Sequence, residues 1–324
     1  MKFGPVSLTE ASGGVLAHSV ALPTGRLRKG QVLDEETLAR LRDAGITRVT
    51  VARLADDDLP ENKAATLVAE GVTGPGLEIR PAFTGRANIH ATGPGVVAVD
   101  RLKVDGVNGI TADVTLATVA EWQRVGTGDM VGTVKIIPYA TAAGHVADRL
   151  APFAGALRLM PPVLDRADLI VTRLPGDADP KSAPILDRLT RLGVEVGVTE
   201  VPHETAALTQ ALREAMAPLR LILTASATAD VADVGPAALR AAGGRLERFG
   251  MPVDPGNLLF LGDLDGAAVI GLPGCARSPA LNGADWVLER VICGVPVTGA
   301  DIAGMGVGGL LKEIPTRPQP RERR

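Results

Sequence analysis

The spacing of hydrophobic residues changes in the middle of the chain. In the second half, short apolar runs alternate with segments whose apolar residues recur every three or four positions, as on a helix face. The apolar runs, expected as buried strands, lie at residues 168–172, 194–198 and 221–224, and the helical segments lie at 181–192 and 204–217. Strands that alternate with helices predict a parallel sheet with right-handed crossovers. We therefore expect an α/β domain over residues 163–310.

The first half of the chain has a different pattern. Residues 1–105 carry short alternating runs separated by turns, which indicates a β-rich N-terminal region. Residues 106–162 have mixed character and are expected to form a connecting region that ends at Pro161 and Pro162. Residues 311–324 are rich in Pro and Arg, so we expect a tail without a packed core.

Two short helices are expected within the N-terminal region. Asp34 is a good capping residue, and the helix that follows it should end at Gly45. A second helix is expected over residues 61–70. The acidic residues 56–58 precede it, and a solvated cap explains them better than a cation site, because carboxylates suit a helix start.

Two loops of small residues follow apolar runs of the α/β domain. The run at 221–224 leads through small and acidic residues to Asp233, and a helix is expected to begin near Gly235. The run at 267–272 leads into residues 273–279, a turn with two prolines and mostly small residues. In an open α/β sheet, ligands bind at the carboxyl ends of the strands. Free N–H groups at helix starts there favour a phosphate, so these loops form the candidate ligand site.

Asp230 and Asp233 are the informative acidic residues of the first loop. A carboxylate at this place can bind Mg²⁺ together with the phosphate oxygens of a substrate. It can equally cap the helix that begins near Gly235, and the spacing alone leaves both roles open. Asp263 and Asp265, by contrast, are expected in the tight turn of a hairpin.

Composition narrows the class of protein. Hydrophobic residues make up 46% of the chain but aromatic residues only 2%, so the core must be built from Ala, Val, Leu and Ile. The net charge of −3 gives no sign of the basic surface that nucleic-acid-binding proteins carry. No apolar run has the length of a membrane span, and the N-terminus lacks the apolar core of a signal peptide. We expect a soluble, cytoplasmic protein with no nucleic-acid or membrane partner.

Several familiar chemistries have no support in the sequence. There is no Gly-x4-Gly-Lys-Ser/Thr phosphate loop, no Gly-x-Ser-x-Gly elbow, and no pair of histidines at helix spacing that would suit zinc. The glycine cluster at 304–309 follows no clear strand, which favours a closing turn over a dinucleotide site. Cys275 stands at an expected helix start, where the pKa of a thiol falls, but no histidine is near it in the sequence.

Three blocks of the α/β domain share their order and spacing with a known family. They are the strand and loop at 221–234, the turn at 249–257 and the run at 269–274. The second is similar to a Met-x-Pro-Gly-Lys-Pro turn, and the third matches a Leu-Pro-Gly-Asn turn. Together, residues 168–292 resemble the molybdopterin-binding domain of the MoeA/MogA type, which serves in molybdenum-cofactor biosynthesis. The start of the chain, at residues 14–17, is similar to MoeA as well.

The chain departs from the family's pattern at several positions. Ala225 and Ser226 stand where the family has two glycines, Asn257 stands in place of its lysine, and Cys275 in place of its asparagine. His203 and the glutamate after it replace an acidic pair. These changes resemble a divergent branch, in which binding is better supported than chemical activity.

The resemblance implies a MogA-like three-layer α/β domain with a mostly parallel sheet, preceded by a β-rich MoeA-like N-terminal region. It implies molybdopterin as ligand or substrate, with Mg²⁺, and with ATP or molybdate as further substrates. Asp233 aligns with the acid that the family uses near the phosphate and the metal, so it is the expected catalytic residue, and Asp233 and Asp230 are the expected metal ligands. Arg277 and Arg173 are expected to neutralise the phosphate. The expected substrate-binding residues are Thr224, Ala225, Ser226, Thr228, Pro273, Gly274, Cys275, Arg277 and Ser278.

Two functions follow from the resemblance, and the sequence leaves both open. One is a transferase that adenylylates molybdopterin or inserts molybdate into it. The alternative is a non-catalytic carrier that delivers the cofactor to a molybdoenzyme. The lost Gly, Lys and Asn residues of the family favour the carrier, whereas Asp233 favours the enzyme. A generic nucleotide-binding α/β protein is a third interpretation, which predicts ATP binding without a pterin. We also expect a homo-oligomer.

Overall fold

The computed structural model describes residues 1–176 and 180–311. The predicted Pro- and Arg-rich tail therefore lies, after residue 311, outside the described residues. The chain folds into two compact units. The first contains Met1–Gly93, Val97–Glu121 and Thr127–Leu159, and the second contains Pro94–Val96, Trp122–Gly126 and the chain from Met160 onward. The finer division expected from the sequence stays a prediction.

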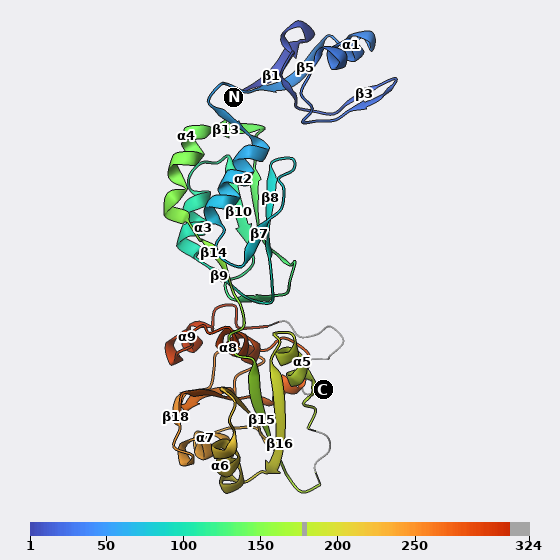
Figure 1. The fold of residues 1–324 in the computed structure, drawn as a ribbon. Helices are drawn as coiled ribbons and strands as arrows, with labels where there is room; N and C mark the ends of the chain where they lie inside the picture. Colours follow the sequence, from blue (N-terminus) through green and yellow to red (C-terminus); the bar gives the residue numbers. More distant parts are fainter. Residues whose placement is uncertain (177–179, 312–324) are drawn as a thin grey trace. The chain divides into compact units, whose positions relative to one another are not determined.

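The N-terminal part of the first unit is a small antiparallel sheet with one helix (Figure 1). Its helix α1 (Glu35–Asp43) begins as expected, because the Asp34 carboxylate accepts the Thr37 N–H at 2.8 Å. Gly45 follows the helix with φ +73°, a left-handed conformation that suits glycine. The elements of this part are β1 (Lys2–Ser7), β2 (Val15–Leu16) and β5 (Arg48–Arg53) in the order β1-β5-β2, the hairpin β3 (Val20–Leu22) and β4 (Gly25–Leu27), and the 3₁₀ helix η1 (Leu8–Glu10).

The rest of the first unit contains a four-stranded antiparallel sheet packed against α2 (Glu61–Val72). The sheet order is β10 (Val114–Thr118), β12 (Met130–Ile136), β8 (Arg86–Ala91), β7 (Leu77–Ile79). The N-cap of α2 is Pro60, and Asp58 lies in the short strand β6 (Asp58–Pro60). The expectation that residues 56–58 cap this helix is therefore wrong. Further elements are β13 (Ala140–Ala142), paired with β6, and α3 (Arg101–Asn108), α4 (Ala143–Val146), η2 (Ala147–Arg149) and η3 (Ala151–Phe153).

The second unit is built on a six-stranded sheet, which confirms the α/β class and the mostly parallel sheet. Its order is β16 (Glu195–Pro202), β15 (Arg166–Arg173), β17 (Leu219–Leu223), β20 (Ala267–Gly271), β19 (Phe260–Leu264), β18 (Arg245–Phe249). The first four strands are mutually parallel, and β19 and β18 are antiparallel to their neighbours. The β19–β20 hairpin turns at Asp265 and Gly266, both with positive φ, as the sequence predicts.

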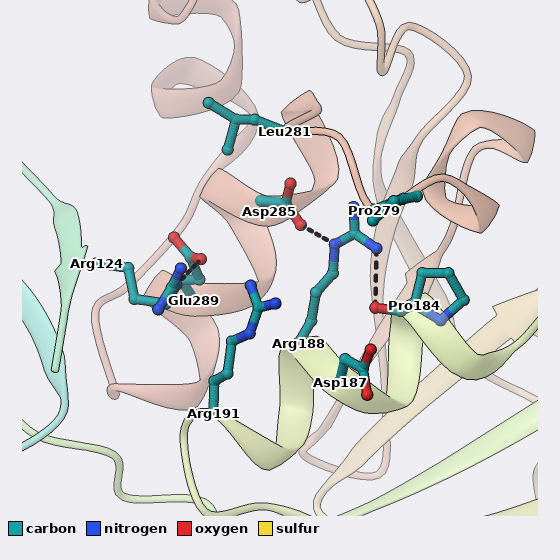
Figure 2. A pocket seen from close by; sticks show the side chains of 9 residues that line it. All are labelled: Arg124, Pro184, Asp187, Arg188, Arg191, Pro279, Leu281, Asp285 and Glu289. Atoms are coloured by element: carbon teal, nitrogen blue, oxygen red, sulfur yellow. Dashed lines mark hydrogen bonds and ion pairs between the residues drawn. The ribbon is translucent and has the colours of Figure 1, made fainter. Parts of the chain in front are cut away.

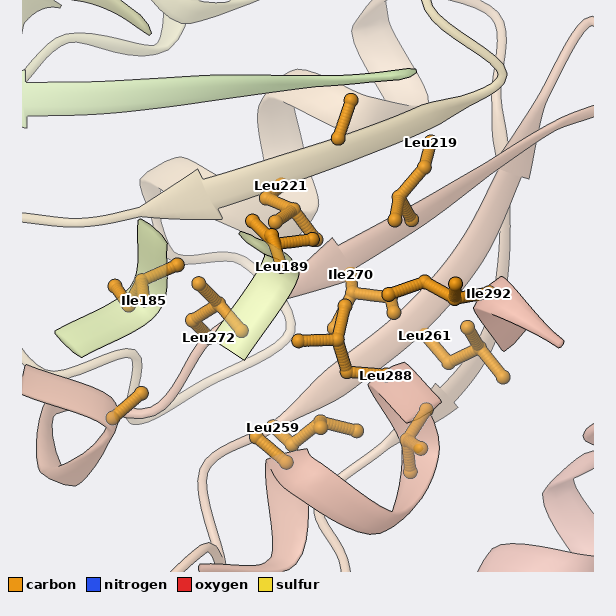
Figure 3. Close-up of a cluster of buried hydrophobic side chains, with 14 of the residues drawn as sticks. Ile185, Leu189, Leu219, Leu221, Leu259, Leu261, Ile270, Leu272, Leu288 and Ile292 are labelled. Atoms are coloured by element: carbon orange, nitrogen blue, oxygen red, sulfur yellow. The ribbon is translucent and has the colours of Figure 1, made fainter. Parts of the chain in front are cut away.

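Helices cover both faces of this sheet, because successive strand residues point to opposite sides. On β15, Leu169 and Val171 belong to one buried cluster and Ile170 to another. Figure 3 shows the first cluster, to which α5 (Ala183–Thr190) and α8 (Gly283–Ile292) contribute. The second cluster includes residues of α6 (Thr205–Glu214) and α7 (Val234–Ala241). The remaining elements are α9 (Gly299–Gly304) and the strands β9 (Gly95–Val99), β11 (Gln123–Val125) and β14 (Leu157–Met160).

The core of the second unit is aliphatic, as the composition predicts. Phe260 is the one fully buried aromatic side chain among the described residues. Its ring fills the space that side chains would need at two glycines: an added Cβ would lie 1.9 Å from the ring at Gly271 and 2.9 Å at Gly235. None of the helices in the described part of the chain combines the length and apolar character needed to cross a membrane.

Candidate functional site

The carboxyl ends of β15, β16 and β17 are joined by a chain of hydrogen bonds. Thr172, on β15, accepts the Ala225 N–H at 2.9 Å, and its hydroxyl lies 2.8 Å from His203 Nδ1. His203 follows β16, and its Nε2 lies 2.8 Å from the Ser226 hydroxyl in the loop after β17. The chain runs from the buried Thr172 through the half-buried His203 to the exposed Ser226. It therefore links the core to the surface at the edge where ligands bind in α/β folds.

The buried hydroxyl decides how the protons of this chain are arranged. Thr172 is 1% exposed, and one lone pair of its oxygen already accepts the Ala225 N–H. Its own O–H needs an acceptor, and His203 Nδ1 is the acceptor among its described contacts. In the neutral imidazole, Nε2 then carries the hydrogen and donates it to Ser226 Oγ. The Ser226 O–H is left to donate outward, so this arrangement favours a hydroxyl that binds an anion over a serine activated as a nucleophile.

The loop after β17 is held by its own short side chains. The Thr224 hydroxyl donates to the Ser226 carbonyl at 2.7 Å, and it lies 3.3 Å from the Thr228 hydroxyl. Asp233 accepts N–H groups with both oxygens, from Val234 at 2.8 Å and from Ala229 at 3.1 Å. It is also the N-cap of α7, so the capping role is observed.

The metal role of Asp230 and Asp233 stays a prediction. Asp230 accepts the Ala232 N–H at 2.7 Å, so it too binds the loop backbone. Within residues 1–176 and 180–311, no three His, Cys, Asp or Glu side chains form a group suited to a metal ion. A carboxylate has about four lone-pair sites, so each aspartate retains capacity for a cation that phosphate oxygens also bind.

The loop after β20 is tied to the loop after β17. It contains the 3₁₀ helix η4 (Gly274–Arg277) rather than the regular helix start that was expected. Arg277 donates from Nη2 to the Thr224 carbonyl at 2.8 Å and from Nε to the Pro180 carbonyl at 2.9 Å. The predicted binding residues of the two loops therefore lie at adjacent strand ends. Within its own loop, the Ser278 hydroxyl accepts the Ala280 N–H at 3.3 Å.

Two of the chemical expectations for this edge change with the structure. Burial raises the pKa of the Cys275 thiol, with the charge of Asp254 adding to the rise, which opposes the low pKa that a helix start can give a thiol. Arg173 donates to the Glu200 carboxylate at 3.0 Å, and Arg277 donates to backbone carbonyls. Both arginines are therefore positioned by protein contacts before any ligand binds.

Arg188 organises the second loop from outside it. It lies on α5, and its Nε donates to the Asp285 carboxylate in a nearly buried ion pair. The two terminal nitrogens use their four donors on four backbone carbonyls, those of Pro184, Ala276, Ser278 and Ala280, at 2.8–3.0 Å. All five guanidinium donors are thus engaged. Three of these carbonyls belong to the loop after β20, which Arg188 clamps against α5.

Sequence reasoning missed the roles of Thr172, His203 and Arg188. A signal existed for the first two, because Thr172 ends an expected strand and His203 lies between the expected strand at 194–198 and the helix expected from 204. The carboxyl ends of parallel strands meet at one edge of the sheet. No signal existed for Arg188, which lies on an amphipathic helix where arginines commonly face solvent. Its partner Asp285 is 97 residues away in the chain.

The chain was compared with known protein families and structures. A family model described as a domain of unknown function, DUF8806, matches residues 5–53. No curated protein matches the chain. Among solved structures, it is similar to the molybdopterin biosynthesis MoeA protein from Pyrococcus horikosii, with 13% identity over 93% of this chain and 76% of that chain. The TM-score is 0.32, so this likeness carries no argument about function.

Proposed function

We propose that the second unit binds a molybdopterin, free or adenylylated, at the carboxyl ends of β15, β16, β17 and β20. The observation that supports this most is the link between the loops after β17 and β20, in which Arg277 donates to the Thr224 carbonyl. These loops hold two of the three blocks that resemble the MoeA/MogA type. The hydrogen bond brings them together although they are about fifty residues apart in the sequence.

The remaining block, the turn at 249–257, packs against the start of α8. The Pro255 carbonyl accepts the Gly283 N–H at 2.8 Å, at the start of α8. Gly256 is held against the same place: a Cβ added to it would lie 2.7 Å from the Gly283 nitrogen. A side chain at either glycine would push the turn away from α8. The close approach gives this turn a structural reason to keep glycine, whatever ligand it faces.

In this proposal Ser226 donates its hydroxyl hydrogen to the phosphate of the pterin. His203 orients Ser226, and Thr172 fixes the tautomer of His203. Hydrogen bonds to charged oxygens are about twice as strong as neutral ones, so a single oriented hydroxyl contributes usefully to affinity. Asp233 and Asp230 would add Mg²⁺ bound jointly to the phosphate.

The enzyme and the carrier differ in what Asp233 does after binding. As an enzyme, the protein would use Mg²⁺ at Asp233 for adenylyl transfer or molybdate insertion. As a carrier, it would hold the cofactor without turnover and release it to a molybdoenzyme. The loss of the family's glycine, lysine and asparagine, where this chain has Ser226, Asn257 and Cys275, favours the carrier.

Mass spectrometry of the ligand carried through purification tests this proposal. The full chain is isolated from cells that make molybdopterin, and the released pterin is quantified for the wild type, Ser226→Ala and Ser12→Ala. Ser12 is exposed and has no described hydrogen bond, so it is a matched control. We expect pterin with the wild type and Ser12→Ala, and several-fold less with Ser226→Ala. Wild-type protein without pterin would overturn the proposal, and bound ATP in its place would favour the nucleotide-binding alternative.

Incubation of the loaded protein with ATP, Mg²⁺ and molybdate separates the enzyme from the carrier. Formation of an adenylylated or molybdenum-containing pterin would show turnover. Recovery of unchanged ligand, together with its transfer to an added apo-molybdoenzyme, would identify a carrier.

A further inference from the structure

A cavity lies between α5 and α8 in the second unit, beside the loop after β20. Its volume is about 190 Å³, enough for several water molecules or a small oxyanion. Figure 2 shows arginine and carboxylate side chains around it. The lining residues are Arg124, Pro184, Asp187, Arg188, Arg191, Pro279, Leu281, Asp285 and Glu289.

The charges that line the cavity are not equally available to a ligand. Arg188 and Asp285 are paired, and Arg188 has no donor left. Arg124 binds Glu289 through Nε at 2.9 Å, which leaves its terminal nitrogens without a described partner. The Arg191 side chain forms no hydrogen bond or ion pair with the described residues, and in Figure 2 it extends from the end of α5 toward α8. The guanidinium groups of Arg124 and Arg191 therefore have N–H donors that can bind a ligand.

Glu289 is a buried lining carboxylate whose charge changes near neutral pH. Burial raises its pKa to about 7, the charge of Asp285 adds to this rise, and Arg124 opposes it. With Glu289 ionised, three carboxylates balance three guanidinium groups around the cavity. With Glu289 protonated, the balance is one positive charge, and the carboxyl group gains a hydrogen to donate. The charged or titratable groups around Glu289 are Arg124 from β11, Asp187, Arg188 and Arg191 from α5 and its end, Asp285 from α8, and Cys293 after α8.

We propose that this cavity is a site for a small tetrahedral oxyanion, held by Arg124 and Arg191 and by the protonated carboxyl group of Glu289. Guanidinium groups suit such ligands because their N–H donors match pairs of oxygens. Binding takes up a proton on Glu289, since an ionised carboxylate would repel the ligand. The site stands independently of the pterin proposal, because Arg124, Arg191 and Glu289 all lie outside the two strand-end loops.

Isothermal titration of the full chain with sulfate tests the site, because sulfate stays a dianion throughout the relevant pH range. If only the protein with Glu289 protonated binds, the apparent Kd should be about tenfold weaker at about pH 8 than at about pH 6. Glu289→Gln imitates the protonated, neutral form and should bind sulfate with little dependence on pH. Titration in two buffers of different ionisation enthalpy should show proton uptake with the wild type and none with Glu289→Gln.

Arg191→Gln is the decisive variant. The Arg191 side chain is exposed and has no described partner, so its replacement should not destabilise the fold. We expect its sulfate affinity to fall at least tenfold at about pH 6. Arg166→Gln makes the same change of charge at an exposed position outside the cavity, and its affinity should stay within twofold of the wild type. Equal affinities for the wild type and Arg191→Gln would overturn the proposal. So would the absence of binding by the wild type at tens of millimolar sulfate at about pH 6.

Discussion

The two loops at the strand ends are held in different ways. In the loop after β17, Thr224, Asp230 and Asp233 bind backbone groups no more than four residues away, in addition to the contacts that this loop makes with Thr172, His203 and Arg277. The loop after β20 is fixed from a distance, because three of its carbonyls bind Arg188 of α5. Local hydrogen bonds can form as the loop itself forms, whereas the clamp requires α5, α8 and the loop to be packed already. We therefore expect changes to the clamp to cost much more stability than changes to the first loop.

The largest effect should come from Arg188→Gln. This change leaves the nearly buried Asp285 without its cationic partner and frees carbonyls that Arg188 binds. Removal of one member of a buried ion pair typically costs about 3–5 kcal/mol. Urea unfolding of the variant should show this loss, and Arg191→Gln, three residues further along, should stay within about 0.5 kcal/mol of the wild type. A loss below about 1 kcal/mol for Arg188→Gln would contradict the clamp.

Glu289 provides a second test of the packing between α5 and α8. It lies one turn after Asp285 on α8, but its negative charge is less well compensated by neighbouring arginines. Its pKa is raised from 4.5 to about 7 in the folded chain, so the folded state holds this proton more tightly than the unfolded state. The associated stability is fully present below about pH 4.5 and is lost as the pH rises through about 7. The difference between the two pKa values corresponds to at most about 3 kcal/mol.

Urea unfolding at about pH 5 and about pH 8 measures this contribution. Other carboxylates titrate over the same range, so the quantity to compare is the change in stability of the wild type minus that of Glu289→Gln. We expect the wild type to lose more stability than the variant on going to the higher pH. Identical losses would mean that Glu289 is charged in the folded protein throughout.

Gly271→Ala tests the strand that leads into the second loop. A Cβ at this position would lie 1.9 Å from the Phe260 ring, and such overpacking typically costs about 1–3 kcal/mol. Gly235→Ala, on the side of the first loop, meets the same ring at 2.9 Å and should cost less. Thermal unfolding of both variants gives the order. A Gly235→Ala variant less stable than Gly271→Ala would show that the ring can shift away from β20 but not from α7.

The smallest change in stability should come from Asp233→Asn. Asparagine caps helices about as well as aspartate, so the loss should be a few tenths of a kcal/mol. If Asp233 binds Mg²⁺, affinity for a pterin ligand should nevertheless become independent of Mg²⁺ in this variant, because the amide carries no charge for the cation. Calorimetric titration with and without Mg²⁺, on both proteins, decides this. The same dependence on Mg²⁺ in both would leave Asp233 as a cap alone.

Much of the architecture was predictable from local pattern. The alternation of apolar runs with helical segments predicts the strands β15, β16 and β17 and their parallel arrangement. This was possible because the periodic spacing of apolar residues in a strand or helix depends only on residues close together in the sequence. Capping residues locate helix starts for the same reason: Asp34, Asp233 and Asn282 each bind N–H groups within three residues of themselves. The expectation that residues 56–58 cap α2 was wrong, because Asp58 lies in the strand β6. This shows the limit of reasoning from short segments.

By itself, the sequence determined the class of fold, the edge at which a ligand is expected and the two loops that line it. Only the tertiary structure decided which side chains act on those loops. His203 and Ser226 come within 2.8 Å because β16 and β17 flank β15, and Arg188 reaches residues about ninety positions later because α5 and α8 pack on one face of the sheet. The physical reason is that periodicity and capping are properties of short segments, whereas the placement of a polar side chain among buried carbonyls depends on how distant segments pack.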